Sequence, residues 1–182
     1  MSLFGTDGIR GRYGESPLND STIRKIGLAI SRSFNDNSIK KVYIAHDGRE
    51  SCESILRNLT IGICSDRSYE IIYLDLFPTP AMTYLLSEND LFDAIGIEIT
   101  ASHNPYHDNG IKIFDKFGYK IKIDQEIKIE NIVYEQIDIK NNTKLNISSN
   151  NLSRKIYIDF ISKLISKNAK TLHKLNIAVD SA

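Results

Sequence analysis

Apolar residues in the first 120 positions alternate between two spacings, and this alternation predicts helices and strands in turn. Helical patterns cover residues 22–34, 51–67 and 80–89. Short runs rich in β-branched residues predict strands over 41–45, 71–75, 94–99 and 111–114. A chain that mixes the two elements in this way folds as layers, so we expect a three-layer α/β/α sandwich.

The connection between the last two predicted strands, residues 100–110, indicates how those strands run. It has no helical pattern, whereas a parallel crossover needs about a dozen residues or more and normally contains a helix. The two strands should therefore be antiparallel, within a mixed, mostly parallel sheet that has one antiparallel strand. The connection is also polar and held between two strands, a common position for functional residues.

After Tyr119 the pattern weakens. We expect a helix over 124–137 that is capped by Asp124, and then a linker rich in Asn, Ser and Lys over 140–151. An amphipathic helix follows over 153–168, with an apolar stripe made of Ile156, Phe160, Leu164 and Ile165.

Residues 175–180 have the composition of a strand that starts just before the chain stops. Because a strand without a following partner is unusual, we expect it to begin a second domain that is cut short. The predicted organisation is a first domain over 1–150, a connecting helix over 151–173 and the truncated start of a second domain over 174–182.

Composition narrows the class of protein. The 182 residues include 23 basic and 23 acidic side chains, with 41% hydrophobic residues, as in an ordinary globular chain. The balanced charge gives no electrostatic case for a nucleic-acid partner. No apolar run approaches the roughly 18 residues of a membrane helix, and the N-terminus has no signal-peptide pattern. Cys52 and Cys64, on one predicted helix, are too far apart for a disulfide, so we expect a cytoplasmic protein without membrane partners.

The segment from Thr100 to Lys112 is the richest in candidate chemistry. It places the hydroxyl of Ser102 between His103 and, at the start of the next strand, Lys112. A hydroxyl that can carry phosphate, with cationic donors nearby, suits phosphoryl transfer. A polar hairpin loop with a capping serine has the same composition, and the residues alone leave both interpretations open.

The same segment also contains His103, His107 and Asp108, which suggests a metal cluster. Pro105 argues against the helix that would bring the two histidines to one face. We interpret His107 as a solvated loop residue.

Two further polar clusters precede this segment. Residues 4–11 hold three glycines and Arg10, which allow a backbone to approach a phosphate, although a flexible N-terminal arm has the same composition. Residues 46–49, His-Asp-Gly-Arg, follow the first predicted strand, where open α/β sheets bind ligands. A strand-to-helix turn with surface charges is the alternative there.

Taken together, the clusters form an ordered set of motifs. These are Phe-Gly-Thr-Asp-Gly-Ile-Arg-Gly at the N-terminus, Asp-Gly-Arg at 47–49, Pro-Thr-Pro-Ala at 78–81, and Gly-Ile-x-Ile-Thr-Ala-Ser-His-Asn-Pro followed by Asp-Asn-Gly-Ile-Lys. The set resembles the α-D-phosphohexomutase superfamily over residues 3–120, and within it most closely the bacterial members that act on glucosamine phosphates.

The resemblance implies a role for each matching residue. Ser102 would carry the transferable phosphate, His103 and Lys112 would assist acid–base chemistry and charge stabilisation, and Arg10 would be a cation near the phosphoserine. Supporting positions would be Asp47, Arg49, Asn104 and Asn109.

The resemblance also implies an activity. Glucosamine 6-phosphate and glucosamine 1-phosphate would be interconverted through a bisphosphorylated sugar, with Mg²⁺ bound by the phosphate on Ser102 and by ligands beyond residue 182. A hexosamine phosphate would be the partner, and a homodimer is compatible with the resemblance. The alternatives are a mannose- or glucose-phosphate mutase of the same superfamily and a non-catalytic phosphosugar-binding module. The chain alone is expected to be inactive, because the later domains of the superfamily are missing.

Two residues depart from the superfamily pattern. Glu98 stands where an apolar residue is usual, and His46 replaces a commoner basic residue. We expect Glu98 to point outward or to find a partner, since it would otherwise be a buried charge.

Overall fold

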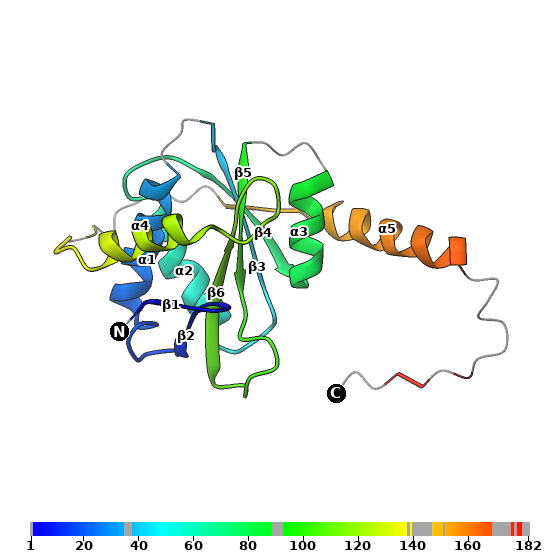
Figure 1. Ribbon diagram of the computed structural model, residues 1–182, viewed down its shortest axis with the longest axis horizontal. Coiled ribbons are helices and arrows are strands. Elements are labelled where there is room, and N and C mark those ends of the chain that lie inside the picture. The colour runs from blue at the N-terminus through cyan, green and yellow to red at the C-terminus, as the bar shows by residue number, and fades with distance from the viewer. Residues whose placement is uncertain are drawn as a thin grey trace.

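In the computed structural model the chain forms one mixed sheet with helices on both faces (Figure 1). The structure describes residues 2–34, 38–88, 93–137, 139, 147–150, 152–168, 176 and 178–179. The elements within these residues are β1 (Phe4–Gly5), β2 (Gly8–Arg12), α1 (Asp20–Ser33), β3 (Lys41–His46), α2 (Cys52–Ile63), β4 (Glu70–Leu76), α3 (Thr79–Glu88), β5 (Ala94–Ile99), β6 (Asp108–Phe114), α4 (Ile123–Val133), β7 (Ile147–Ser149) and α5 (Leu152–Asn168).

The strand order is β1-β2-β6-β5-β3-β4-β7. Strands β5, β3, β4 and β7 pair in parallel, while β5–β6, β6–β2 and β2–β1 are antiparallel. The antiparallel direction predicted for the strands around residues 100–110 is therefore confirmed. The sheet holds more antiparallel pairing than the sequence indicated, because the N-terminal residues pair onto β6 as β1 and β2 instead of forming a free arm.

Alternating side chains of the sheet pack into two separate cores, which confirms the three-layer sandwich. Val42 and Ile44 of β3 belong to the core under α1, α2 and α4. Tyr43 and Ala45 of the same strand belong to the core under α3. Figure 1 shows α1, α2 and α4 on one side of the sheet and α3 on the other, with α5 extending from it. This alternation follows from the two-residue period of a strand.

Several boundaries differ from those predicted. The N-cap of α4 is Lys122, without a side-chain cap hydrogen bond, so the predicted cap Asp124 is wrong. β7 forms inside the expected linker, because β4 offers it a free edge to pair with in parallel. At the C-terminus Asn176, Ala178 and Val179 are not in a strand, and the remaining residues of the strand predicted over 175–180 lie outside the described residues. Cys52 and Cys64 are both free thiols, as expected.

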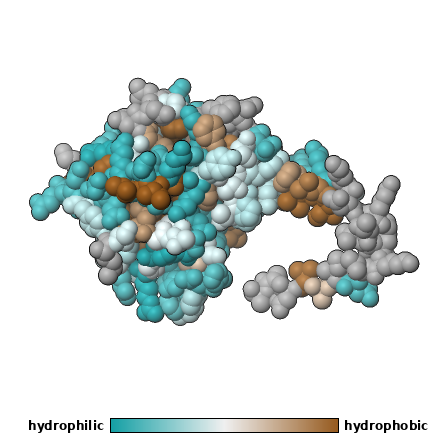
Figure 2. Space-filling model, viewed as in Figure 1, coloured by the Kyte–Doolittle hydropathy of each residue, from teal (hydrophilic) through white to brown (hydrophobic). Residues whose placement is uncertain are grey.

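Apolar side chains remain exposed on two helices, and Figure 2 shows the resulting surface over α4 and α5. Ile123 and Ile127 are exposed on α4. On α5 the predicted stripe is only partly buried, because Phe160 stacks on Tyr84 while Leu164 and Ile165 are exposed. Among the described residues, no helix has the length and apolarity needed to cross a membrane.

Helices α1 and α2 touch through two glycines. A Cβ added at Gly27 would lie 2.3 Å from the carbonyl oxygen of Leu59, and one added at Gly62 would lie 2.0 Å from that of Arg24. Both contacts are to backbone atoms, so a side chain at either position can be accommodated only by moving the helices apart. The two glycines therefore set the distance between α1 and α2, the helices against which β3 and the loop after it pack.

We expect Gly27→Ala to lower the free energy of unfolding by about 1–3 kcal/mol, because the overpacking outweighs the better helix propensity of alanine. Urea denaturation followed by circular dichroism measures this change. Gly5→Ala is the control, since its Cβ would meet nothing nearer than 3.6 Å. Equal stability of the two variants would contradict the close helix contact.

Candidate functional site

The polar segments singled out from the sequence meet at one edge of the sheet. Residues 47–51 follow the carboxyl end of β3, and residues 100–107, here called the serine loop, follow that of β5. These two strands are parallel neighbours, so their carboxyl ends lie side by side. β2 approaches from the other side of β6, with Arg10 directly opposite Gly110. The three clusters of the sequence thus form one site.

Asp47 holds the start of the serine loop. Its Oδ2 accepts hydrogen bonds from the Thr100 hydroxyl at 2.7 Å and from the Ala101 amide at 3.3 Å. Burial opposes its ionisation, but the hydrogen bonds from Thr100 and Arg49 and the Arg49 charge outweigh burial and lower the pKa of Asp47. Asp47 is therefore a carboxylate at neutral pH that ties β3 to β5.

Arg49 donates to Asp47 and to carbonyl groups of the serine loop and of Asp108, with all of its donors used. Its Nε donates to Asp47 at 2.9 Å. Nη1 and Nη2 each donate to two backbone carbonyl oxygens, those of Pro105, Asp108, Ser102 and Asn104. A guanidinium has five N–H groups, and five acceptors surround this one. Arg49 therefore shapes the loop and has no donor left for a phosphate.

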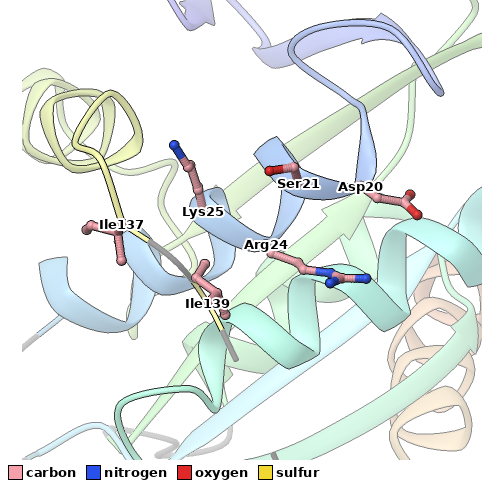
Figure 3. A pocket seen from close by; sticks show the side chains of 6 residues that line it. All are labelled: Asp20, Ser21, Arg24, Lys25, Ile137 and Ile139. Atoms are coloured by element: carbon pink, nitrogen blue, oxygen red, sulfur yellow. The ribbon is translucent and has the colours of Figure 1, made fainter. Parts of the chain in front are cut away.

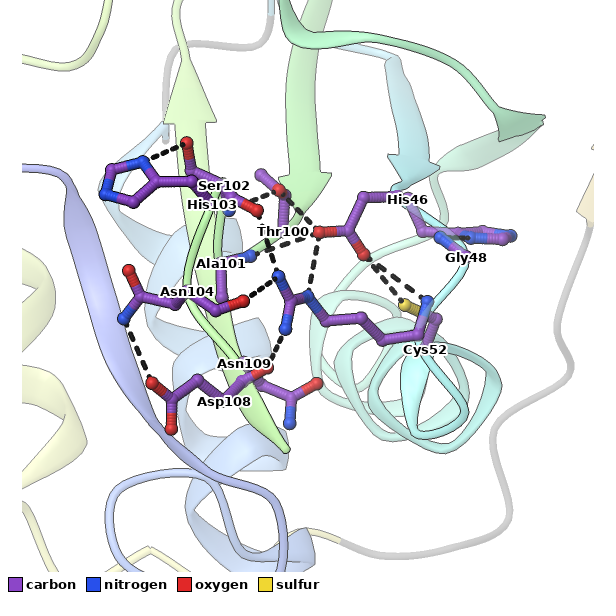
Figure 4. Close-up of polar contacts among 12 residues, drawn as sticks. His46, Gly48, Cys52, Thr100, Ala101, Ser102, His103, Asn104, Asp108 and Asn109 are labelled. Atoms are coloured by element: carbon purple, nitrogen blue, oxygen red, sulfur yellow. Dashed lines mark hydrogen bonds and ion pairs between the residues drawn. The ribbon is translucent and has the colours of Figure 1, made fainter. Parts of the chain in front are cut away.

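Ser102 stands at the exposed tip of the serine loop in a left-handed backbone conformation, with φ of 57°. Its amide donates to the Thr100 hydroxyl at 2.9 Å, and its Oγ lies 3.4 Å from Nδ1 of His103. Left-handed backbone costs a non-glycine residue about 1–2 kcal/mol. The contacts of Arg49 and Thr100 hold Ser102 in this conformation, which presents its hydroxyl to solvent beside an imidazole (Figure 4).

Arg10 offers the site an unused cationic donor. Its Nη1 is buried and has no hydrogen-bond partner among the described residues. Its side chain crosses Gly110, where an added Cβ would lie 2.9 Å from Cδ of Arg10 and 2.5 Å from the carbonyl oxygen of Thr100. A side chain at position 110 would block this path, so the glycine lets Arg10 extend toward the start of the serine loop.

Lys112 and Glu98 are direct cross-strand partners on β6 and β5. Lys112 is half-buried and makes no ion pair or hydrogen bond with any residue in the described part of the chain. Glu98 is only 1% exposed, and its Oε2 has no partner. The expectation that Glu98 points outward or finds a partner is therefore wrong. Burial, reinforced by the charge of Asp47, raises its pKa to about 8, although Lys112 opposes the shift.

The remaining predicted residues brace the end of the serine loop. Asn104 donates to Asp108 at 3.0 Å (Figure 4), and the buried Asn109 accepts a hydrogen bond from the Ser51 hydroxyl. His107 contacts Arg12 at 3.1 Å. No group of three or more His, Cys, Asp or Glu among the described residues could hold a metal ion.

Three contributors were not predicted as site residues. Thr100 and Ser51 anchor the loop, and Cys52 places its thiol 3.8 Å from Oδ1 of Asp47. Burial and the nearby Asp47 charge raise the pKa of Cys52 to about 11, so the thiol stays protonated. Thr100 could have been found from its position at the end of a buried strand. Ser51 and Cys52 carry no comparable signal.

Cavities lie on both flanks of the serine loop. One of about 390 Å³ is lined by Phe77, Glu98, Thr100 and neighbouring residues of the β4–α3 connection. Another of about 370 Å³ is lined by Tyr13, Ser51, Tyr106 and Asn109 among others. A third, of about 240 Å³, lies against α1 and holds none of the predicted site residues (Figure 3). There Lys25 is bound to the carbonyl oxygen of Glu135 and Arg24 to Asn58.

Comparisons with known proteins show the family to which the chain belongs. Residues 1–139 match the family model described as phosphoglucomutase/phosphomannomutase, alpha/beta/alpha domain I. A phosphoglucosamine mutase of Campylobacter fetus is 43% identical over 148 residues, covering 81% of this chain and 32% of that protein. One of Pseudoalteromonas translucida is 37% identical over 181 residues, covering 98% and 39% respectively.

Solved structures resemble the fold as well. A candidate phosphomannomutase of Thermus thermophilus superposes with a TM-score of 0.67 and 25% identity, covering 80% of this chain and 32% of that one. A phosphoglucomutase/phosphomannomutase family protein of Burkholderia thailandensis gives a TM-score of 0.57 at 24% identity, covering 78% of this chain and 31% of that one. The chain thus spans between about a third and two fifths of the length of the curated relatives named here.

Replacing Arg49 by lysine keeps the charge but removes the fork that binds four carbonyl groups. Because each charge-assisted hydrogen bond contributes about 1.5–3 kcal/mol, we expect amide hydrogen exchange in residues 101–108 to accelerate at least about tenfold. Arg57→Lys is the matched control, since Arg57 is exposed on α2 and has none of these contacts. Unchanged exchange in the loop would show that Arg49 does not hold it.

Ser102→Gly should be more stable than Ser102→Ala by roughly 0.5–1 kcal/mol, because only glycine adopts the left-handed backbone without a steric penalty. Both variants lack the hydroxyl, so chemical denaturation of the pair isolates the backbone effect. At the helical residue Ser87 in α3 the same pair should rank in the opposite order. If the glycine and alanine variants had the same order of stability at Ser102 as at Ser87, the backbone of Ser102 would not be strained.

Proposed function

The chain belongs to the phosphoglucomutase/phosphomannomutase family, and from this membership we propose that it carries the phosphoserine of a mutase acting on glucosamine phosphates. The phosphoglucosamine mutases among its relatives support the choice of sugar. Because the chain spans only about a third to two fifths of those relatives, the proposed activity is that of a whole protein to which this chain contributes the phosphorylated residue.

In the proposed reaction Ser102 alternates between phosphorylated and free states. A substrate hydroxyl oxygen attacks the phosphorus, the bond between phosphorus and Ser102 Oγ breaks, and the hydroxyl proton passes to a base while Oγ recovers a proton. The bisphosphorylated sugar reorients, and its other phosphate returns to Oγ in the reverse sense. His103, whose Nδ1 lies 3.4 Å from Oγ, is placed to hold or deliver the proton at that oxygen.

The observation that carries the proposal is the buried, unpartnered Nη1 of Arg10 beside the serine loop. A buried cationic donor without an acceptor costs free energy unless an anion completes it. Lys112, which lies opposite the buried Glu98, adds a second cation that makes no hydrogen bond or ion pair in the described part of the chain. A phosphate on Ser102 would give both cations an acceptor. A plain polar hairpin loop would explain neither the unpartnered Nη1 of Arg10 nor the unpaired ammonium of Lys112.

The contacts of Asp47 and Arg49 support a positioning role. Phosphoryl transfer depends on alignment and on electrostatic stabilisation more than on covalent help from the protein. A loop that is fixed by four hydrogen bonds from one side chain to the carbonyl oxygens of Ser102, Asn104, Pro105 and the adjoining Asp108 presents Ser102 Oγ in one orientation. Arg49 and Asp47 would thereby act on the rate without touching the phosphate.

Magnesium is part of the proposal only through Ser102. The described residues contain no cluster that could hold a metal ion, and Mg²⁺ needs six oxygen ligands in near-octahedral geometry. The phosphate on Ser102 would supply one oxygen, and the others would come from outside this chain. The bound ion would neutralise developing charge on the phosphoryl oxygens.

We further propose a first domain over residues 1–150. The pairing of β7 with β4 supports this extent, because it brings residues 147–149 into the same sheet as β3 and β5. Residues 151–173 would connect to a second domain that starts at 174.

A chimera tests the function. This chain replaces the matching part of the Campylobacter fetus phosphoglucosamine mutase, and turnover is measured on glucosamine, mannose and glucose phosphates. We expect glucosamine-phosphate turnover and a species about 80 Da heavier on Ser102, both lost in Ser102→Ala and retained in Ser87→Ala. Preferred turnover of mannose or glucose phosphate would overturn the sugar, and phosphate binding without turnover would favour a binding module. The 182-residue chain alone should show no turnover.

A further inference from the structure

The sheet face that holds Arg10 also holds a buried acid which the proposed reaction does not use. Two rows of residues run across β2, β6, β5 and β3 on this face. The first contains Arg10, Gly110, Thr100 and Asp47, and the second contains Gly8, Lys112, Glu98 and Ala45. In the first row Arg10 on β2 lies next to Gly110 on β6, and in the second row Lys112 on β6 lies next to Gly8 on β2. Only the second row places an acid directly beside its cation.

The surroundings of Glu98 leave it one polar neighbour of opposite charge. Ala45 lies opposite it on β3, and Gly96, which precedes it on this face of β5, packs against Met82 and Leu86 of α3. The charged groups that face Glu98 in the described structure are Lys112 from β6 and Asp47 after β3. His46, which lines the same cavity, is bound to Asp75 and to the amide of Gly48.

Lys112 has room to move. A Cβ at Gly8 would lie 3.4 Å from the Lys112 Cα, so the absence of a side chain at Gly8 leaves one flank of the lysine open. Directly opposed residues of an antiparallel pair have Cβ atoms about 4.5–5.5 Å apart, which is within reach of an ammonium on a four-carbon stem. Yet the Lys112 ammonium and the Glu98 carboxyl oxygens lie more than 4.0 Å apart in this structure, so the two side chains form no ion pair.

We propose that Glu98 is a positioning residue for Lys112 that competes, according to its protonation, with a phosphate on Ser102 for the Lys112 ammonium. As a neutral acid Glu98 leaves Lys112 available to the phosphate. As a carboxylate it attracts the ammonium inward, away from the serine loop. The phosphate part of this inference rests on the proposed function, whereas the pairing of Glu98 with Lys112 does not.

The sign of the effect follows from the charges. The pKa of Glu98, about 8, means that the acid is mostly neutral at pH 7 and ionises as the pH rises above 8. Asp47 stays ionised throughout that range, because its pKa is lowered. Alkaline conditions should therefore close the Glu98–Lys112 pair, and a phosphate dianion that engages Lys112 should raise the pKa of Glu98 further.

Carbon-13 NMR of the Glu98 side-chain carboxyl in the 182-residue chain tests the pairing without any activity. We expect a midpoint near pH 8 in the wild type and an increase of roughly one unit in Lys112→Met, because the neutral side chain no longer favours the carboxylate. Lys116→Met, in the turn after β6, should leave the midpoint unchanged. A midpoint that Lys112→Met does not move, or one near the ordinary value for glutamate, would overturn the proposal.

The isosteric variant Glu98→Gln gives a second readout, independent of how Lys112→Met folds. The Lys112 Cε resonance should move through pH 8 in the wild type and stay constant over that range in Glu98→Gln. In the chimera, kcat/KM of the wild type should fall above pH 8, and Glu98→Gln should lose that fall. A Lys112 resonance that is equally pH-dependent in both proteins would refute the pairing, and an inactive chimera with the expected resonances would refute only the proposed function.

Discussion

The site depends on one guanidinium whose donors are all matched by acceptors. Arg49 binds Asp47, three carbonyl oxygens of the serine loop and that of Asp108 at the start of β6, and the three loop carbonyls would otherwise be open to water in a connection without helix or strand. Its partner Asp47 in turn fixes Thr100 and Ala101. One ion pair between two residues of the β3–α2 connection thus determines the path of a loop some fifty positions later, and through that path the backbone conformation of Ser102.

Glycines on neighbouring strands make space in the sheet for the long cations of the site. Arg10 crosses Gly110, and Lys112 lies beside Gly8, so each cation occupies the surface that its glycine neighbour leaves free. A sheet face normally buries apolar side chains. Here the rows near the serine loop hold several polar side chains, and the apolar core under α3 begins directly beside Glu98, at Ala45 on β3 and at Gly96 two residues earlier on β5. This boundary explains how Glu98 can be both buried and next to charged groups.

Local pattern predicted the elements with the strongest periodicity, because β3, β5 and α1 are buried on defined faces. The antiparallel pairing of β5 and β6 followed from loop length alone. β1, β2 and β7 escaped prediction because they are short and exist only by pairing with strands distant in the sequence. Within the site, the motif residues could be singled out by type. The five contacts of Arg49 could not, since they depend on the path of the loop, and the isolation of Glu98 could not, since it depends on the packing of α3.

The pairing of β2 with β6 also has a consequence for how the protein is made. Arg10 leaves the ribosome about a hundred residues before the start of its partner strand at Asp108. A contact between segments so far apart forms late and slowly compared with local ones. During synthesis β1 and β2 therefore stay unpaired until β6 has emerged. When β2 then pairs with the edge of β6, that edge is no longer open to another chain. The cation that would meet the phosphate is thus synthesised well before the serine loop and reaches its position only once β6 has formed.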